Sequence, residues 1–299
     1  MRNNIKNIKL KFSNLTKEES LVRGTNKRER MIGLIENLTQ FNQKEKFPHL
    51  YIYSPPGLGK THTVNQFLKV SELPYFVVSG NTSMFAFGIQ LAVINYQNVE
   101  KTNIIIYVDD CDEIFKNEQN CNTMKNVLDG EKKFVYEKSL ASQFGFLSDL
   151  QKEAISYHGE DGKMGFVVPT DNIRFVFTSN FSLPIDDDVQ LARQKGGYKS
   201  VLMAHRNAIR SRCKVADFDL TPQEHWGWIA DVTLNPDFLP EISDSKKNII
   251  LEFLWDNWSQ LNERSIRSIE KMANLMKYYP NEYENLWQMD YLKPYYYEY

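Results

Sequence analysis

The chain of 299 residues has few cysteines, little net charge and no long apolar run. Its three cysteines, Cys111, Cys121 and Cys213, lack metal-site spacing, which favours a reduced, cytoplasmic interior. The 36 basic and 38 acidic side chains give a net charge of −2, so no overall field directs the protein to DNA or a membrane. No stretch approaches the about 18 apolar residues of a membrane span, and MRNNIKNIKLKF has no signal-peptide centre. We therefore expect a cytoplasmic protein without a membrane segment.

A glycine- and proline-rich run lies between a β-rich stretch, HLYIY, and a helical pattern, THTVNQFLKV. Strand, tight turn and helix are the context of a phosphate-binding loop, whose usual pattern is G-x-x-x-x-G-K-[ST]. Ser54 replaces the first glycine and is acceptable there if its φ is negative, whereas Lys60 would reach the outer phosphates and Thr61 would bind Mg²⁺. The residues expected to contact the nucleotide are Ser54, Pro55, Pro56, Gly57, Leu58, Gly59, Lys60, Thr61 and His62.

A second signal is the run NIIIYVDDCDEIF, in which five apolar residues precede Asp109 and Asp110. Such a run predicts a central parallel strand, and carboxylates at its end lie where open α/β sheets bind ligands. We expect Asp109 to hold Mg²⁺ and Asp110 to orient or deprotonate the attacking water. Hydrolases of this kind usually have Glu at the second position, so the rate of hydrolysis is left open.

The alternation of strand and helix patterns predicts an α/β fold with a three-layer, mostly parallel sheet, followed by a small helical domain. Thr221-Pro222 interrupts the pattern. The predicted boundaries are a nucleotide-binding domain over 1–221, a helical lid over 222–291 and an aromatic tail over 292–299. The expected strands are 49–53, 75–79, 103–108, 173–178 and 214–218.

With these motifs in this order, the sequence resembles the AAA+ ATPases over roughly residues 19 to 290. NIRFVFTSNFSLP resembles the family's sensor-1 strand, which implies that Asn180 contacts the γ-phosphate or the attacking water. AIRSRCKVADFDLTP resembles the SRC element of clamp-loader subunits. That resemblance makes Arg212 the arginine finger for a neighbouring subunit's ATP, with Arg210 as the alternative.

Two weaker assignments follow from the same resemblance. The amphipathic run NERSIRSIEKMANLMK matches the sensor-2 helix of the lid, which places Arg267, or Arg264 one turn earlier, over the phosphates. ESLVRGTNKRERMIGLIENL occupies the place of the adenine-side segment, where Val22 would contact the base. Ordinary helix packing accounts equally well for Val22.

An insert over about 139–162, between two strand-like stretches, resembles the chelatase and MoxR-like branch and the AAA+ proteins of large phages. In AAA+ rings this region often faces the pore, so Phe144, Phe146 and Tyr157 are candidate substrate contacts, with loop packing as the alternative. The resemblance implies a homo-oligomeric ring that uses ATP and Mg²⁺ to remodel a macromolecule, either protein or DNA. The composition, rich in Asn, Lys, Ile and Tyr, suggests an AT-rich genome such as that of a phage.

Three other functions are alternatives to this one. The SRC arginine favours a clamp-loader or helicase-loader ATPase of DNA replication. Asp110 in place of Glu keeps open an ATP-gated assembly protein with little turnover. A P-loop kinase of a small metabolite would need neither Arg212 nor a helical lid.

Overall fold

The computed structural model describes residues 15–39, 49–79, 82–110, 112, 114–115, 118–129, 132–139, 142–159, 165–180, 183 and 198–293. The chain forms two compact units, which we describe separately. The sheet unit comprises the described residues of Leu34–Tyr53 and Thr61–Asp217. The helical unit comprises those of Met1–Gly33, Ser54–Lys60 and Phe218–Tyr299.

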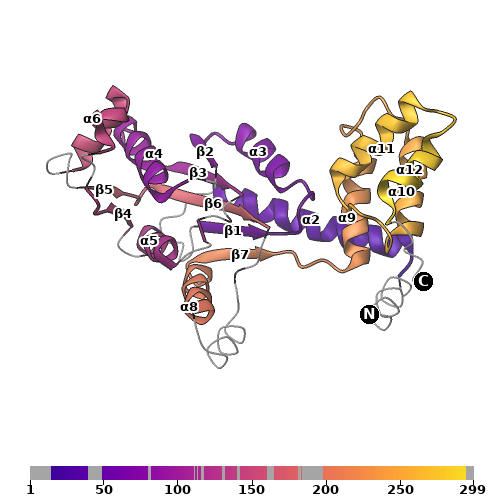
Figure 1. The fold of residues 1–299 in the computed structure, drawn as a ribbon, viewed down its shortest axis with the longest axis horizontal. Helices are drawn as coiled ribbons and strands as arrows, with labels where there is room; N and C mark the ends of the chain where they lie inside the picture. The colour runs from indigo at the N-terminus through magenta and orange to yellow at the C-terminus, as the bar shows by residue number, and fades with distance from the viewer. Residues whose placement is uncertain are drawn as a thin grey trace. The chain divides into compact units, whose positions relative to one another are not determined.

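The sheet unit is built on five parallel strands, which Figure 1 shows side by side and flanked by helices. Their order across the sheet is β2-β3-β6-β1-β7. The bounds are β1 (His49–Tyr53), β2 (Tyr75–Ser79), β3 (Ile104–Asp109), β6 (Ile173–Ser179) and β7 (Cys213–Asp217). β6 is buried along its whole length, as expected for a central strand covered on both faces. The predicted fold class is confirmed.

Among the described residues, five helices accompany the sheet: α3 (Lys60–Val70), α4 (Met84–Gln97), α5 (Glu118–Leu128), α6 (Asp149–His158) and α8 (Tyr198–Arg210). Ser83 caps α4 by accepting a hydrogen bond from the Ala86 N–H, and Ser148 begins α6 with a capping box. A separate antiparallel pair, β4 (Lys133–Tyr136) and β5 (Phe166–Pro169), flanks the 3₁₀ turn η1 (Phe144–Phe146) and α6. Residues 140–141 and 160–162 of the expected insert lie outside the described residues.

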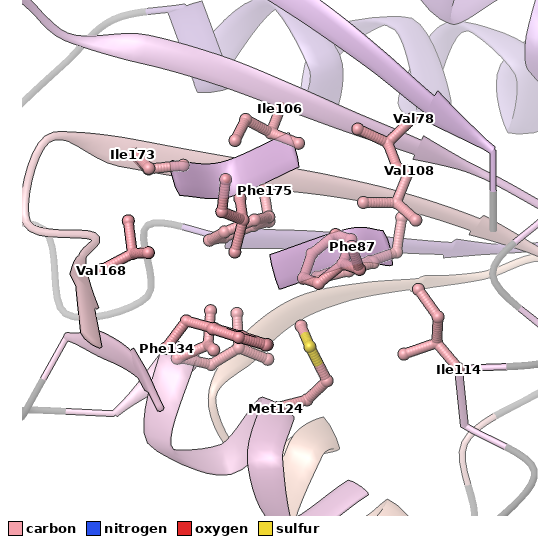
Figure 2. Packing of buried hydrophobic residues seen from close by; sticks show 14 of the residues in the cluster. Val78, Phe87, Ile106, Val108, Ile114, Met124, Phe134, Val168, Ile173 and Phe175 are labelled. Carbon is pink, nitrogen blue, oxygen red and sulfur yellow. The ribbon is translucent and has the colours of Figure 1, made fainter. Parts of the chain in front are cut away.

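Aromatic side chains join the two sheets into one core (Figure 2). The ring of Phe87 on α4 lies 6.1 Å from that of Phe134 on β4 and 6.4 Å from that of Phe175 on β6. All three side chains are fully buried. The core thereby fixes β3 and β6, whose carboxyl ends carry the predicted acidic site.

The helical unit contains the first part of α2 (Lys17–Thr39) and the helices α9 (Pro222–Leu234), α10 (Asp244–Asn257), α11 (Ile266–Tyr278) and α12 (Tyr283–Tyr291). α9 begins with a capping box between Thr221 and Glu224, with proline at its first turn. Arg28 of α2 pairs with Asp231 of α9 at 2.7 Å. Four of the five tryptophans are buried, namely Trp226, Trp228, Trp258 and Trp287, as expected for core residues. Of the aromatic tail, residues 294–299 lie outside the described part of the chain.

Candidate functional site

The loop Ser54–Lys60 has the backbone conformation that a phosphate-binding loop needs. Gly57 and Gly59 adopt φ values of 80° and 77°, which side-chain-bearing residues rarely take. Such conformations turn backbone N–H groups toward one concave, anion-binding side. Ser54 is not among the described residues with positive φ. The sequence analysis accepted serine in place of the first glycine on the condition of a negative φ, and this condition is met.

Lys60 closes the loop on itself. Its Nζ donates to the carbonyl oxygens of Ser54 (2.7 Å) and Pro55 (3.3 Å), and the side chain is buried. A buried ammonium is retained only with such compensating acceptors. The sequence analysis predicted that Lys60 contacts the phosphates. In the structure its ammonium group instead donates to two carbonyl oxygens at the start of the loop.

Helices α9 and α11 of the same unit are hydrogen-bonded to this loop. The Ile266 N–H, at the start of α11, donates to the carbonyl of Gly57 (2.8 Å). The indole N–H of the fully buried Trp228 donates to the carbonyl of Leu58 (3.1 Å). The conformation of the loop is therefore tied to the helices that were predicted to form the lid.

The two candidate sensor-2 arginines have different surroundings. Arg264 donates through Nε to Trp258 O (2.9 Å) and through Nη2 to Ser259 O (3.4 Å), and burial lowers its pKa. Its guanidinium also lies over the Trp258 ring, 5.8 Å from the centroid. Arg267 is exposed and follows Ile266, the residue bonded to the loop. Arg264 thus has a structural role, which leaves Arg267 as the better candidate for contact with phosphate.

In the sheet unit, Asp109 gathers three hydroxyl groups at the carboxyl end of β3. Its Oδ1 accepts from Thr61 Oγ1 (3.0 Å), Tyr107 OH (2.6 Å) and Thr178 Oγ1 (2.7 Å). The Thr61 hydroxyl and the Asp109 carboxylate, predicted from two motifs far apart in the sequence, are thus in direct contact. The pKa of Tyr107 is raised above its usual range by burial and by its bond to Asp109, so this phenol stays protonated as a donor.

These two oxygen ligands suit Mg²⁺, which takes few protein ligands and completes its shell with water and substrate phosphates. Within the described residues, no three or more His, Cys, Asp or Glu side chains gather as they would around a metal held by the protein alone. The pair of Thr61 and Asp109 therefore fits a metal that enters with a nucleotide, and no dedicated metal centre is required.

Asp110 and Asn180 lie next to each other beyond the strand ends. Asn180 Nδ2 is 3.5 Å from Asp110 Oδ1, and the Asp110 N–H donates to Thr178 Oγ1 (3.3 Å). Asp110 adopts a φ of 50°, which is uncommon for a residue with a side chain. The structure thus brings together the two residues that were predicted to orient the attacking water.

Three partners of this edge were missed by the sequence analysis. Asp112 Oδ1 accepts from Ser179 Oγ (2.6 Å) and from the Asn180 N–H (3.1 Å), while Tyr107 and Thr178 support Asp109. Tyr107 precedes Asp109 by two residues, so both project from one face of β3. This spacing could have indicated that Tyr107 and Asp109 are neighbours. Their hydrogen bond could not be predicted, because it depends on side-chain geometry.

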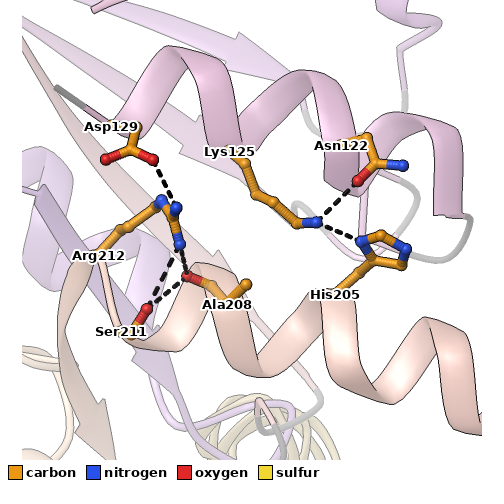
Figure 3. Close-up of polar contacts among 7 residues, drawn as sticks. All are labelled: Asn122, Lys125, Asp129, His205, Ala208, Ser211 and Arg212. Atoms are coloured by element: carbon orange, nitrogen blue, oxygen red, sulfur yellow. Dashed lines mark hydrogen bonds and ion pairs between the residues drawn. The ribbon is translucent and has the colours of Figure 1, made fainter. Parts of the chain in front are cut away.

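Arg212 and Arg210 are both engaged within their own chain. Arg212 Nη1 donates to Ala208 O (2.7 Å) and Nη2 donates to Asp129 Oδ2 (2.5 Å). Figure 3 marks both contacts. Arg210 Nη1 donates to Leu183 O (3.1 Å) and lies 3.7 Å from Asp217 Oδ2. A finger role for either side chain therefore requires it to exchange or share these partners.

Most of the remaining predicted contacts are exposed, whereas Leu58 of the loop is buried. Val22 on α2 is 58% exposed, and Thr61 and His62 on the first turn of α3 are also exposed. Of the aromatic side chains in the insert, Phe146 is 92% exposed and Tyr157 is 66% exposed, while Phe144 packs against the core.

Residues 50–190, just under half of the chain, match the family model "AAA: ATPase family associated with various cellular activities". This match supports an AAA+ ATPase with nucleotide binding at a P-loop. No curated protein matches the chain. No helix in the described ranges is long and apolar enough to cross a membrane.

Proposed function

We propose that the chain is a Mg²⁺-dependent AAA+ ATPase that hydrolyses ATP at the subunit interfaces of an oligomer. The observation that carries this proposal is the 3.0 Å bond between Thr61 Oγ1 and Asp109 Oδ1, which joins the first turn of α3 to the acidic end of β3. The family match over residues 50–190 supports the same reading.

The loop residues would hold the triphosphate through backbone N–H groups and the Lys60 ammonium. Thr61 and Asp109 would hold Mg²⁺, which neutralises charge on the phosphates when it is bound. Asp110 would accept the proton of the attacking water, and Asn180 would orient that water. The 3.5 Å separation of Asp110 Oδ1 and Asn180 Nδ2 supports a shared task.

Arg212 would act on the ATP of the neighbouring subunit, and Arg267 on that of its own. A planar, permanently charged guanidinium suits charge that develops during phosphoryl transfer. We further propose the predicted division into a domain over 1–221, a lid over 222–291 and a tail over 292–299. Because Ile266 donates to Gly57, a change in the loop would pass directly to the lid.

ATP hydrolysis would drive the remodelling of a macromolecular partner in the cytoplasm. The gene would come from a phage. The nearly fully exposed ring of Phe146 supports a contact with that partner, because an aromatic side chain so placed leaves most of its apolar surface uncovered by the described residues. A clamp-loader or helicase-loader role in DNA replication remains a variant of this proposal, based on the SRC arginine.

The test is steady-state phosphate release from ATP with and without Mg²⁺, for the wild type and for Asp110→Asn. We expect Mg²⁺-dependent release by the wild type, and loss of release with retained ATP binding in the variant. Asn is matched to Asp in size, so this change removes the carboxylate base and little else.

ATP-gated assembly with little turnover is the second candidate function. It is favoured by Asp110 itself, since aspartate is one methylene shorter than the usual glutamate and its contact with Asn180 is at the limit of a hydrogen bond. Equal inertness of wild type and Asp110→Asn, while both assemble with ATP, would select this function over the first.

A further inference from the structure

The sheet unit contains a groove of about 1120 Å³ that is lined by none of the predicted site residues. This volume is at or above the roughly 300–1,000 Å³ of ordinary ligand pockets. Three walls enclose it: the start of α4 at 83–85, the face of α5 between 118 and 126, and the β4 segment at 134–138.

The groove runs along the outer edge of β4. Successive residues of a strand point to opposite faces, so a groove over one face would be lined by every second residue. Here all five residues from Phe134 to Lys138 line it, whereas no residue of β5 does. In the described chain β4 pairs only with β5, so the edge along the groove is the one facing away from β5.

The pairing pattern identifies which main-chain groups face the groove. The Thr170 N–H donates to Lys132 O (2.7 Å), so the next pair, Lys133 with Pro169, is of the non-hydrogen-bonded kind. Pro169 has no N–H and therefore suits a non-hydrogen-bonded position of the pair. Its carbonyl points away from β4 and accepts a hydrogen bond from Asn95 Nδ2 (3.0 Å). Two residues further, Val135 opposite Val167 repeats this geometry. The N–H and C=O of Val135 therefore point away from β5, toward the groove.

The walls suit an extended polypeptide of low net charge. α5 contributes amide side chains, among them Asn122 and Asn126, which can donate to and accept from peptide groups. The other side contributes the rings of Phe85 and Tyr136, whose centroids are 5.2 Å apart. The charged lining is balanced, with the carboxylates Glu118 and Glu137 and the ammonium groups Lys125 and Lys138. A lining without net positive charge does not match a phosphate backbone.

We propose that this groove binds an extended, near-neutral polypeptide segment of the partner, which adds to β4 as a further strand. Main-chain hydrogen bonds at Val135 would supply affinity, and apolar side chains of the segment would pack on Phe85 and Tyr136. This proposal rests on the proposed function, because it names the class of macromolecule on which the ATPase acts.

The probe is a fluorescein-labelled synthetic peptide of about twelve residues, with alternating valine and threonine, one lysine and one glutamate. Its anisotropy is measured with the full-length protein without nucleotide. We expect saturable binding that Val135→Pro weakens about tenfold or more, because proline removes the N–H facing the groove. The matched control is Val167→Pro, which makes the same change in the paired strand at the position directly opposite. It should bind as the wild type does.

A second variant keeps the test decisive if Val135→Pro does not fold. Asn126→Trp adds a bulky side chain at an exposed position of α5 in the groove, and Ser156→Trp does the same on α6 outside it. Only the first should lose the peptide. Unchanged binding in both Val135→Pro and Asn126→Trp, or no binding by the wild type, overturns the proposal. So does binding of a labelled oligothymidine in place of the peptide with the same dependence on Asn126.

Phosphate release, measured in parallel, separates the two proposals. Peptide binding by a protein that releases no phosphate would leave the groove established and the ATPase function refuted. Phosphate release without peptide binding would support the ATPase function and refute the proposed role of the groove.

Discussion

Arg212 and Asp129 form an ion pair within one chain, with Nη2 and Oδ2 2.5 Å apart, although 83 residues separate them in sequence. The Asp129 side chain is 53% exposed and the Arg212 side chain 24%, so this ion pair is partly open to solvent. Asp129 directly follows the last residue of α5, where a negative charge opposes the helix dipole. Its pairing with Arg212 offsets that cost. An anionic group at this position competes with any phosphate for the same arginine.

The first prediction follows from this competition. Asp129→Asn should raise the rate of phosphate release about two- to fivefold, since a partly exposed ion pair is worth no more than about 1 kcal/mol. The control is Asp149→Asn, which removes an exposed carboxylate paired with Lys152 on α6. A fall in turnover as large as that of Arg212→Ala would contradict this view and would mean that Asp129 positions the arginine.

A second prediction concerns the phosphate loop. Gly57→Ala should weaken nucleotide binding and lower the stability of the helical unit by roughly 1–3 kcal/mol, because residue 57 needs a positive φ. The added Cβ would also lie 2.2 Å from Ser265 Cβ. Thermal melting and titration with a fluorescent ATP analogue measure both effects. Gly33→Ala, on α2 with nothing within 4 Å of its added Cβ, should leave nucleotide binding unchanged and raise stability slightly, since alanine is favoured over glycine inside a helix; equal losses in the two variants would refute the role of the loop conformation.

The third prediction separates the two sensor-2 candidates. Arg264→Ala should lower the melting temperature, because it removes the bonds to the carbonyls of Trp258 and Ser259. Arg267→Ala should leave melting unchanged and slow phosphate release. The reverse pattern, in which Arg264→Ala melts normally and fails only in turnover, would reassign the sensor.

A fourth prediction is a loss of stability in acid. Burial, with Arg174 and Lys132 nearby, lowers the pKa of His49 from 6.5 to about 3. The folded chain thus keeps His49 neutral while the unfolded chain protonates it, so its contribution to stability is complete above pH 6.5 and is lost as the pH falls toward 3. The Phe175 N–H donates to His49 Nδ1 (3.2 Å), which requires that nitrogen to be unprotonated.

The measurement is urea unfolding between pH 7 and pH 5. His49→Asn should flatten the decline in unfolding free energy by about 0.7 kcal/mol per pH unit at pH 6.5 and by up to about 1.4 kcal/mol per pH unit near pH 5. An unchanged slope in His49→Asn would contradict the assignment of the acid sensitivity to this residue.

Much of the fold could be predicted because it depends on local patterns. The apolar run of β3 that ends in Asp109 specifies a buried strand with a carboxylate at its tip, and the Gly57–Lys60 spacing specifies the loop. The contact of Thr61 with Asp109 follows from these two, because parallel strands bring their carboxyl ends to one edge.

What escaped prediction depends on side-chain geometry across long separations in sequence. The partner of Arg212 could not be read from the SRC segment, because Asp129 reaches it only through the packing of α5 against α8. The same holds for Trp228, which looked like a core residue and also bonds to Leu58. The two strands beside the groove, β4 and β5, could be predicted from the sequence. Which main-chain groups of β4 face the groove could not, because this depends on the hydrogen-bonding pattern of the strand pair near Pro169.

The most direct test of ATP hydrolysis at subunit interfaces is phosphate release by complexes that contain both Lys60→Ala and Arg212→Ala subunits. Each variant alone should be nearly inactive, since the first lacks the phosphate-binding ammonium and the second should lose about 10³-fold in turnover. In co-expressed, co-purified complexes, about a quarter of the interfaces would join an intact loop to an intact finger, so about a quarter of wild-type activity should return. Activity no greater than the sum of the two variants, in complexes shown to contain both, would contradict the account.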